Sequence, residues 1–304
     1  MERRGFIKRL GLGAAAVSAA STLSLPAFAK GKVAAAPFKL DFAPHFGMFK
    51  QHAPGGLVDE LRFMADQGFR SLEDNGLLKR PLAEQELIGK TLDQLGMRMG
   101  VFVVDGGDNW KVSLTTGKQE FLDNFVATCK ASVEAAKRVN AKWMTVVPGY
   151  FERNLPIGVQ TGNVIDALKR GAEIFEPHGM AMVLEPLSDN PDLFLRHADQ
   201  TYMICRAVGS PACKLLYDAY HMQRNEGNLI ATMEKTWSEI AYIQIGDNPG
   251  RKEPGTGEIN YANVFQFIHK KGFTGILGME HGNALPGKEG ELALIEAYRK
   301  VDVK

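Results

Sequence analysis

Four oxygen-bearing side chains each end a short apolar run in the second half of the chain: Glu185, Asp218, Gln244 and Glu280. Removing a carboxylate from water at such a place costs free energy unless it is paired or holds a metal ion. Three carboxylates and one amide form a hard oxygen set that suits Mn²⁺ or Mg²⁺. A helix cap or a salt bridge is the alternative for each residue alone. It explains all four together less well, because uncompensated carboxylates repel one another.

Asp218 and His221 belong to one stretch, 215–228, that has two interpretations. An imidazole three residues beyond a strand-end carboxylate suits a metal site or a proton-transfer site. Short D-x-x-H patterns are common, however, so Asp218 as a helix cap and His221 as a surface residue stay open alternatives. We expect the polar residues that follow, 223–226, to form a solvated loop.

The elements that would position these residues alternate regularly along the chain. Apolar runs predict strands at 38–42, 69–73, 99–104, 142–147, 180–185, 214–217, 240–245 and 274–280. Helical periodicity and glycine stops predict helices at 57–67, 82–95, 119–139, 162–176, 198–208, 228–234, 261–270 and 289–301.

Eight strand–helix pairs predict an α/β fold, a (β/α)8 TIM barrel that forms a single domain over residues 30–304. The continuous apolar strands are typical of a parallel sheet buried on both faces. An open doubly wound sheet is the alternative, but its G-x-G-x-x-G loop after the first strand is absent. In a barrel the carboxyl ends of the strands form the active site, so the four oxygen-bearing residues would converge there.

Residues 1–29 have the pattern of an export signal. Arg3 and Arg4 precede an uncharged run from 10 to 29 that ends in Ala-Phe-Ala. The paired arginines followed by Phe-Ile-Lys resemble a twin-arginine signal. We therefore expect a folded protein exported to the periplasm, with a mature chain that begins at Lys30. A membrane anchor is the alternative, and the short run rich in Ala, Gly and Ser disfavours it.

The composition limits the classes of partner. Formal net charge is +1. The leader contributes +3, so the remaining residues carry about −2 and have no basic surplus of the kind that binds nucleic acid. Three cysteines do not make a disulfide framework, although one pair could form. No stretch after the leader is apolar and long enough to span a membrane. We expect a small-molecule partner, and the sequence is compatible with a homo-oligomer.

Four segments in order resemble the hydroxypyruvate isomerase group of the xylose isomerase-like barrels, which include sugar isomerases and epimerases. They are 183–187, 217–222, 243–261 and 278–280, and the most specific is D-x-P-G-R-x-E-P-G-x-G-E-I-N-Y at 247–261. The resemblance is close over 180–285 and looser over the rest of the mature chain. The export leader and the segments 69–76 and 104–107 depart from the group's pattern, which leaves the substrate open.

The resemblance implies roles for individual residues. Glu185, Asp218, Gln244 and Glu280 would hold one divalent ion, and Glu185 and Glu280 would also transfer protons. His221 would hydrogen-bond a substrate oxygen, and Arg251 would bind a substrate carboxylate or hydroxyl. The implied reaction moves a carbonyl between adjacent carbons through an enediolate, with a base and an acid for the two proton transfers.

Other candidates and alternatives remain. Glu73 ends the second expected strand and His45 follows the first, so both are candidates for substrate binding, with a salt bridge and a solvated loop as the respective alternatives. Proton transfer on both faces of one carbon would make a sugar epimerase from the same site. A non-catalytic periplasmic sugar-binding barrel is a further alternative. A metal-dependent hydrolase or lyase is less favoured, because such sites use more histidines than the seven present.

Overall fold

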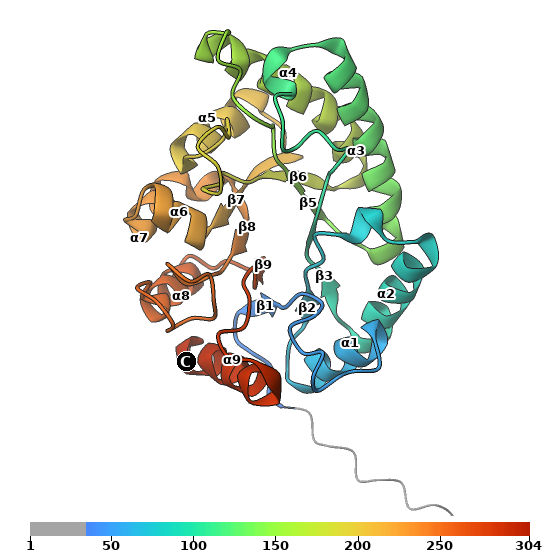
Figure 1. Ribbon diagram of the computed structural model, residues 1–304, viewed down its shortest axis with the longest axis vertical. Helices are drawn as coiled ribbons and strands as arrows, with labels where there is room; N and C mark the ends of the chain where they lie inside the picture. The colour runs from blue at the N-terminus through green and yellow to red at the C-terminus, as the bar shows by residue number, and fades with distance from the viewer. Residues whose placement is uncertain (1–34) are drawn as a thin grey trace, which may run out of the picture. The chain divides into compact units, whose positions relative to one another are not determined.

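A computed structural model describes residues 35–304, in which strands and helices alternate along the chain (Figure 1). The strands are β1 (Asp41–Ala43), β2 (Ser71–Leu72), β3 (Arg98–Met99), β4 (Val101–Val103), β5 (Trp143–Val146), β6 (Ala181–Leu184), β7 (Cys213–Asp218), β8 (Ile240–Gln244) and β9 (Ile276–Gly278). The predicted leader, 1–29, and its cleavage site lie outside the described residues.

The α-helices flank the strands (Figure 1). They are α1 (Leu57–Asp66), α2 (Leu82–Leu95), α3 (Gln119–Val139), α4 (Ile157–Phe175), α5 (Ala198–Val208), α6 (Ala219–Asn225), α7 (Leu229–Thr236), α8 (Tyr261–Lys270) and α9 (Gly287–Val301). Short 3-10 turns are η1 (Leu77–Lys79), η2 (Leu114–Thr116), η3 (Glu176–His178) and η4 (Trp237–Glu239).

All the strand pairs are parallel. Seven strands form one sheet in the order β1-β9-β8-β7-β6-β5-β4, and β2 pairs with β3. Only Gly100 separates β3 from β4, so the two occupy a single strand position. A parallel bridge between His45 and Glu73 joins the end of β1 to that of β2. The ring therefore has the eight strand positions of the predicted barrel, and the fold prediction is confirmed.

The alternation of side chains along each strand decides which residues face the barrel interior. A small buried cluster fills that interior, made by Ala43, Val101, Val183, Leu216, Tyr242 and Ile276. A larger cluster packs the outer side of the strands against the helices. Residues two positions beyond an interior residue share its direction, so Glu185, Asp218 and Gln244 point toward the barrel axis.

Several predicted bounds differ from those observed: the first strand, expected at 38–42, is 41–43, and the third, expected at 99–104, is divided at Gly100. Helix α4 begins at Ile157, five residues before its expected start. The expected loop after β7 is helix α6, so that prediction was wrong. The Asp218 side chain accepts a 2.7 Å hydrogen bond from the Tyr220 N–H and caps this helix. The helix-cap alternative for Asp218 is therefore observed, whereas His221 is fully buried and not a surface residue.

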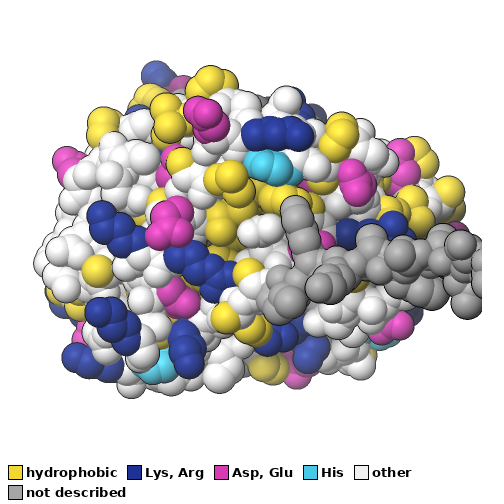
Figure 2. All heavy atoms as spheres, turned by 90° about the horizontal axis from the view of Figure 1, so that it is seen from below, with side chains coloured by type: hydrophobic (Ala, Val, Ile, Leu, Met, Phe, Trp, Pro, Cys, Tyr) yellow, Lys and Arg dark blue, Asp and Glu magenta, His cyan; other side chains and the backbone are white. Residues whose placement is uncertain are grey.

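The remaining features of the described residues are ordinary for a globular domain. No helix within 35–304 has the length and apolarity needed to cross a membrane. Cys129, Cys205 and Cys213 are buried free thiols. Figure 2 shows basic and acidic side chains interspersed on one face, with no large field of a single sign.

Candidate active site

The four predicted ligands lie at the carboxyl ends of neighbouring strands. Glu185 follows β6, Asp218 ends β7, Gln244 ends β8, and Glu280 lies two residues beyond β9. Asp218 is paired in register with Gln244, which in turn is paired with Gly278. Asp218 and Gln244 are fully buried and Glu185 nearly so, while 24% of the Glu280 side chain is exposed. The barrel thus brings all four residues to one end.

Three buried oxygens in this group have no hydrogen-bond partner among the described residues. They are Oε1 of Glu185, Oε1 of Gln244 and Oε2 of Glu280. Buried polar atoms are nearly always hydrogen-bonded, because leaving one unpaired costs free energy. Three orphaned acceptors at the same end of the barrel therefore fit a site that is completed by a cation.

The carboxylates also disturb one another's protonation. Burial, followed by the charges of Glu280 and Asp218, raises the pKa of Glu185 well above its usual value. Burial raises the pKa of Glu280 to about 7, and the positive charge of Arg251 opposes that rise. A carboxyl group that titrates near neutrality suits proton transfer, because it can both accept and return a proton at that pH.

The loop between β8 and α8 places Arg251, and the buried side chain of Asp247 organises that loop. Its Oδ2 accepts hydrogen bonds from the N–H groups of Gly255 and Gly257, both at 2.9 Å, and its Oδ1 accepts one from Ile259 at 3.0 Å. Arg251 itself has φ of 49°, a left-handed conformation that is uncommon for a residue with a side chain.

The guanidinium of Arg251 lies among the candidate ligands. Its Nη2 is 3.2 Å from Asp218 Oδ2 and 3.1 Å from Glu280 Oε2, although the second contact lacks hydrogen-bond geometry. Its Nε donates a 3.1 Å hydrogen bond to the Glu280 carbonyl oxygen. Burial disfavours the charged form, but Asp218, Glu280 and Glu185 outweigh burial and raise the pKa of Arg251. The acidic cluster therefore already attracts one positive charge.

His221 is close enough to join the cluster as a ligand. Glu185, Asp218 and His221 offer atoms that all lie within 4.8 Å of one another. Donor groups face both ring nitrogens: the Ser188 N–H donates to Nδ1 at 3.2 Å, and Arg251 Nη2 lies 3.1 Å from Nε2. Burial lowers the pKa of His221 and favours the neutral ring, which can accept at only one nitrogen. These contacts therefore leave His221 with two candidate roles, as a metal ligand through Nε2 or as a contact to a substrate oxygen.

The two remaining candidates line a cavity beside Glu280, and both already have polar contacts. Glu73 is 1% exposed, and both of its oxygens accept hydrogen bonds inside the barrel, from Tyr242 and Gln244. His45 has Nδ1 at 2.9 Å from the Phe46 carbonyl oxygen and Nε2 at 3.1 Å from that of His281. Substrate binding by these two residues stays a prediction.

Sequence reasoning missed two residues at the site. Asn75 donates a 3.0 Å hydrogen bond from Nδ2 to Glu280 Oε1. Asp189 has Oδ2 at 3.8 Å from His221 Nε2, and 43% of its side chain is exposed. Asn75 lies two residues beyond the strand-end Glu73, and this spacing could have pointed to it. Asp189 lies in an irregular loop and offers no comparable signal.

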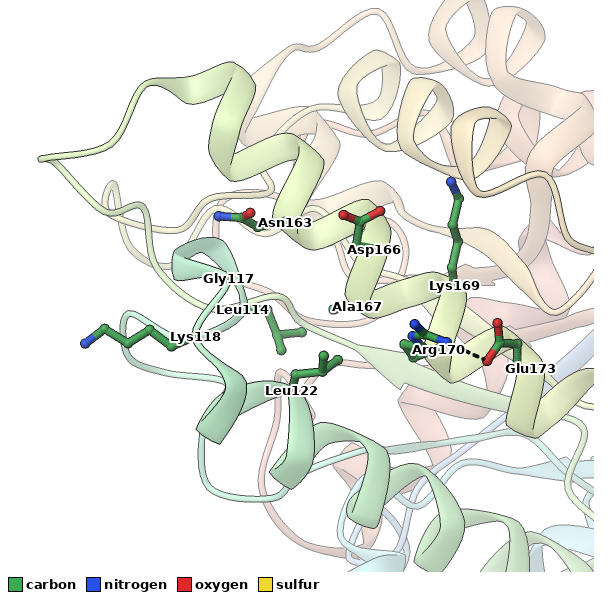
Figure 3. A pocket seen from close by; sticks show the side chains of 10 residues that line it. All are labelled: Leu114, Gly117, Lys118, Leu122, Asn163, Asp166, Ala167, Lys169, Arg170 and Glu173. Carbon is green, nitrogen blue, oxygen red and sulfur yellow. Dashed lines mark hydrogen bonds and ion pairs between the residues drawn. The ribbon is translucent and has the colours of Figure 1, made fainter.

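A cavity of about 330 Å³ opens beside Glu280. Its volume is at the lower end of the range for small-molecule sites. It is lined by His45, Phe46, Glu73, Asp74, Asn75, Gly76, Arg80 and Glu280. A larger hollow of about 520 Å³ lies between α3 and α4, where Figure 3 shows side chains such as Lys118, Asp166 and Arg170. That hollow contains none of the predicted site residues.

Comparison with known proteins identifies the family of the chain. The family model described as xylose isomerase-like TIM barrel matches residues 61–301. The chain belongs to this family. The hydroxypyruvate isomerase of Escherichia coli is 31% identical over 185 residues, which cover 60% of this chain and 69% of that protein. A 2-oxo-tetronate isomerase of Cupriavidus necator is 27% identical over 241 residues, 77% of this chain and 89% of the relative. These relatives bear out the predicted class of enzyme, an isomerase.

Solved structures agree on the fold of the family. A family 2 AP endonuclease from Brucella melitensis has a TM-score of 0.73 at 22% identity, covering 85% of this chain and 99% of its own. The 3-keto-D-glucoside 4-epimerase of E. coli has a TM-score of 0.71 at 19% identity, covering 86% of this chain and 99% of its own. At these identities the likeness supports the barrel alone.

Proposed function

We propose that this protein is a divalent-metal-dependent isomerase of a small hydroxy keto acid or sugar, working with Mn²⁺ or Mg²⁺. The observation that carries the proposal is the set of three orphaned buried oxygens at adjoining strand ends. A guanidinium nitrogen lies within 3.2 Å of Asp218 and Glu280, which supports a cation-binding role for the same oxygens. The named isomerase relatives support the reaction class.

In this proposal Glu185, Asp218, Gln244 and Glu280 hold the ion. When bound, the ion supplies positive charge that stabilises the oxygens of an enediolate. The oxygen-rich donor set suits Mn²⁺ and Mg²⁺ better than an ion that prefers sulfur.

The protein's own side chains would move the protons. One of Glu185 and Glu280 removes the proton alpha to the substrate carbonyl, and the other returns a proton to the neighbouring carbon. His221 hydrogen-bonds a substrate oxygen next to the reacting carbon, and burial lowers its pKa and so favours the neutral ring.

Arg251 is the candidate for recognising a substrate carboxylate. Its side chain is 28% exposed, and it carries the positive charge that an acid needs. The two relatives named above are named for three-carbon and four-carbon keto acids. A hydroxylated keto acid is therefore the first substrate class to try, with ketoses next.

The test is hydrogen exchange with solvent. Purified protein stripped of metal and reloaded with Mn²⁺ should incorporate deuterium from D₂O at the alpha carbon of a hydroxy keto acid and yield its isomer. Glu185→Gln and Glu280→Gln should abolish this turnover while the melting temperature stays near the wild-type value. Inversion at one carbon would instead indicate an epimerase. No exchange with any keto acid or ketose would refute catalysis and favour a sugar-binding barrel.

We also propose that the leader directs the folded protein to the periplasm. The paired Arg3 and Arg4 followed by an uncharged run support this proposal. Cell fractionation and N-terminal sequencing should find the mature protein in the periplasm, beginning at Lys30. Replacement of both arginines by lysine should keep it in the cytoplasm, and a retained leader would contradict the proposal. The homo-oligomer stays a prediction.

A further inference from the structure

Inside the barrel, the Glu73 side chain accepts hydrogen bonds from two residues of β8. Its Oε1 accepts a 2.8 Å hydrogen bond from Gln244 Nε2, and its Oε2 accepts one of 2.9 Å from the Tyr242 hydroxyl. Tyr242 and Gln244 are two positions apart on the strand, so both face inward toward the same carboxyl group. Glu73 comes from the other side of the ring, at the end of β2.

The barrel leaves room for this buried carboxyl group at two glycines. A Cβ on Gly278 would lie 1.7 Å from Glu73 Oε2, and one on Gly100 would lie 2.4 Å from the Tyr242 hydroxyl oxygen. No Lys or Arg among residues 35–304 forms an ion pair with Glu73. Burying a carboxyl group without a neighbouring cation costs free energy. We therefore expect the Glu73 side chain to have a function in the protein.

The hydrogen bond to Glu73 decides which way the Gln244 amide faces. A glutamine amide has a donor end and an acceptor end. With Nε2 held by Glu73, Oε1 is left on the other side, where it has no partner. Beside an ionised Glu73, the reversed amide would set two acceptors against each other. It would also direct N–H groups at the acidic cluster, where they would repel a cation.

We infer that Glu73 is a positioning residue for the metal site: it holds the Gln244 side chain so that the amide oxygen faces the ion. The inference rests on the metal dependence proposed above. Groups that orient a metal ligand from behind commonly change ion affinity by roughly 10- to 100-fold when they are removed.

The experiment measures Mn²⁺ affinity of metal-free protein by isothermal titration calorimetry, which needs no turnover. Glu73→Met keeps the side-chain length but removes both acceptors, and should weaken Mn²⁺ binding by roughly 10- to 100-fold. The matched control is Tyr242→Phe, which deletes the other hydrogen bond of the same carboxyl group and leaves Gln244 held. It should keep the wild-type affinity to within about threefold, because the ligand stays oriented.

If Glu73→Met does not fold, two further variants test the same inference. Gln244→Glu alone sets two carboxylates against each other and should weaken Mn²⁺ binding. Adding Glu73→Gln restores an amide-to-carboxylate hydrogen bond with an oxygen toward the ion, and should recover at least tenfold in affinity. A purely structural role for Glu73 would not produce this recovery.

Three results would overturn the inference. The first is wild-type Mn²⁺ affinity in Glu73→Met, and the second is an equal loss in Tyr242→Phe. The third is a Glu73→Gln, Gln244→Glu double variant that binds no better than Gln244→Glu. Failure of the wild-type protein to bind either Mn²⁺ or Mg²⁺ would instead refute the proposed metal dependence on which the inference depends.

Discussion

Substitution of Gly278 tests how closely the Glu73 side chain packs inside the barrel. In Gly278→Ala the new methyl group would lie 1.7 Å from Glu73 Oε2, a distance that no relaxation of the methyl group alone relieves. Glu73 must move, and its hydrogen bonds from Tyr242 and Gln244 are lost. Each of these buried hydrogen bonds contributes roughly 0.5–1.5 kcal/mol, so the variant should lose roughly 1–3 kcal/mol of unfolding free energy.

Urea unfolding of the metal-free protein at low temperature measures this loss. Gly162→Ala is the control, because that exposed glycine lies inside α4 and a Cβ there meets nothing within 4 Å. It should stabilise the protein by up to about 1 kcal/mol. In a Glu73→Ala background the Gly278 substitution should cost much less, since the two Glu73 atoms nearest the methyl group are then gone and the next atom, Gln244 Cγ, lies at 3.1 Å. Additive effects of the two substitutions would refute the packing argument.

Three further predictions concern charge, pH and a helix cap. Arg251→Met should cost the metal-free protein roughly 1–3 kcal/mol, because the partly buried carboxylates lose their counter-charge. Mn²⁺ should then raise its melting temperature more than that of the wild type, and an equal rise would contradict this. Burial lowers the pKa of His281 to about 3 from 6.5. The unfolded state therefore binds the extra proton between these values, and stability should fall as pH drops through this window, by about 2 kcal/mol at pH 5. His281→Asn should flatten that dependence in urea titrations, and an unchanged slope would exclude His281 as its source. Asn260 caps α8 by accepting a 3.1 Å hydrogen bond from the Asn263 N–H. Asn260→Ala should cost about 1 kcal/mol by urea unfolding, whereas Asn260→Asp should cost little.

The placement of the candidate ligands could be predicted because it follows from strand periodicity. Val183, Leu216 and Tyr242 face the barrel interior, and the residue two positions beyond each shares that direction. Once eight strand–helix pairs are recognised, the carboxyl ends of the strands are the one place where these side chains meet. The third expected strand was less regular than predicted, because Gly100 interrupts it to make room for the Tyr242 hydroxyl.

Contacts between distant segments could not be predicted in this way. Glu73 was expected to face a substrate, but its partners Tyr242 and Gln244 lie some 170 residues further along the chain. The position of Arg251 depends on three hydrogen bonds to the Asp247 side chain in an irregular loop. Residue type suggests that Arg251 binds an anion, and the loop geometry supplies the further fact that its guanidinium lies against Asp218.

The contacts of His221 leave two chemical roles open for one side chain. Its spacing from Asp218 suggests a metal ligand, and its distance from Glu185 and Asp218 permits one. The Ser188 N–H faces Nδ1 and Arg251 Nη2 faces Nε2, and both groups can only donate. A neutral imidazole accepts at one nitrogen only, so the ring cannot satisfy both donors at once. The site therefore combines an oxygen-rich set suited to a hard cation with a buried imidazole whose Nε2 lies 3.5 Å from Asp218 Oδ2 and 3.7 Å from Glu185 Oε1.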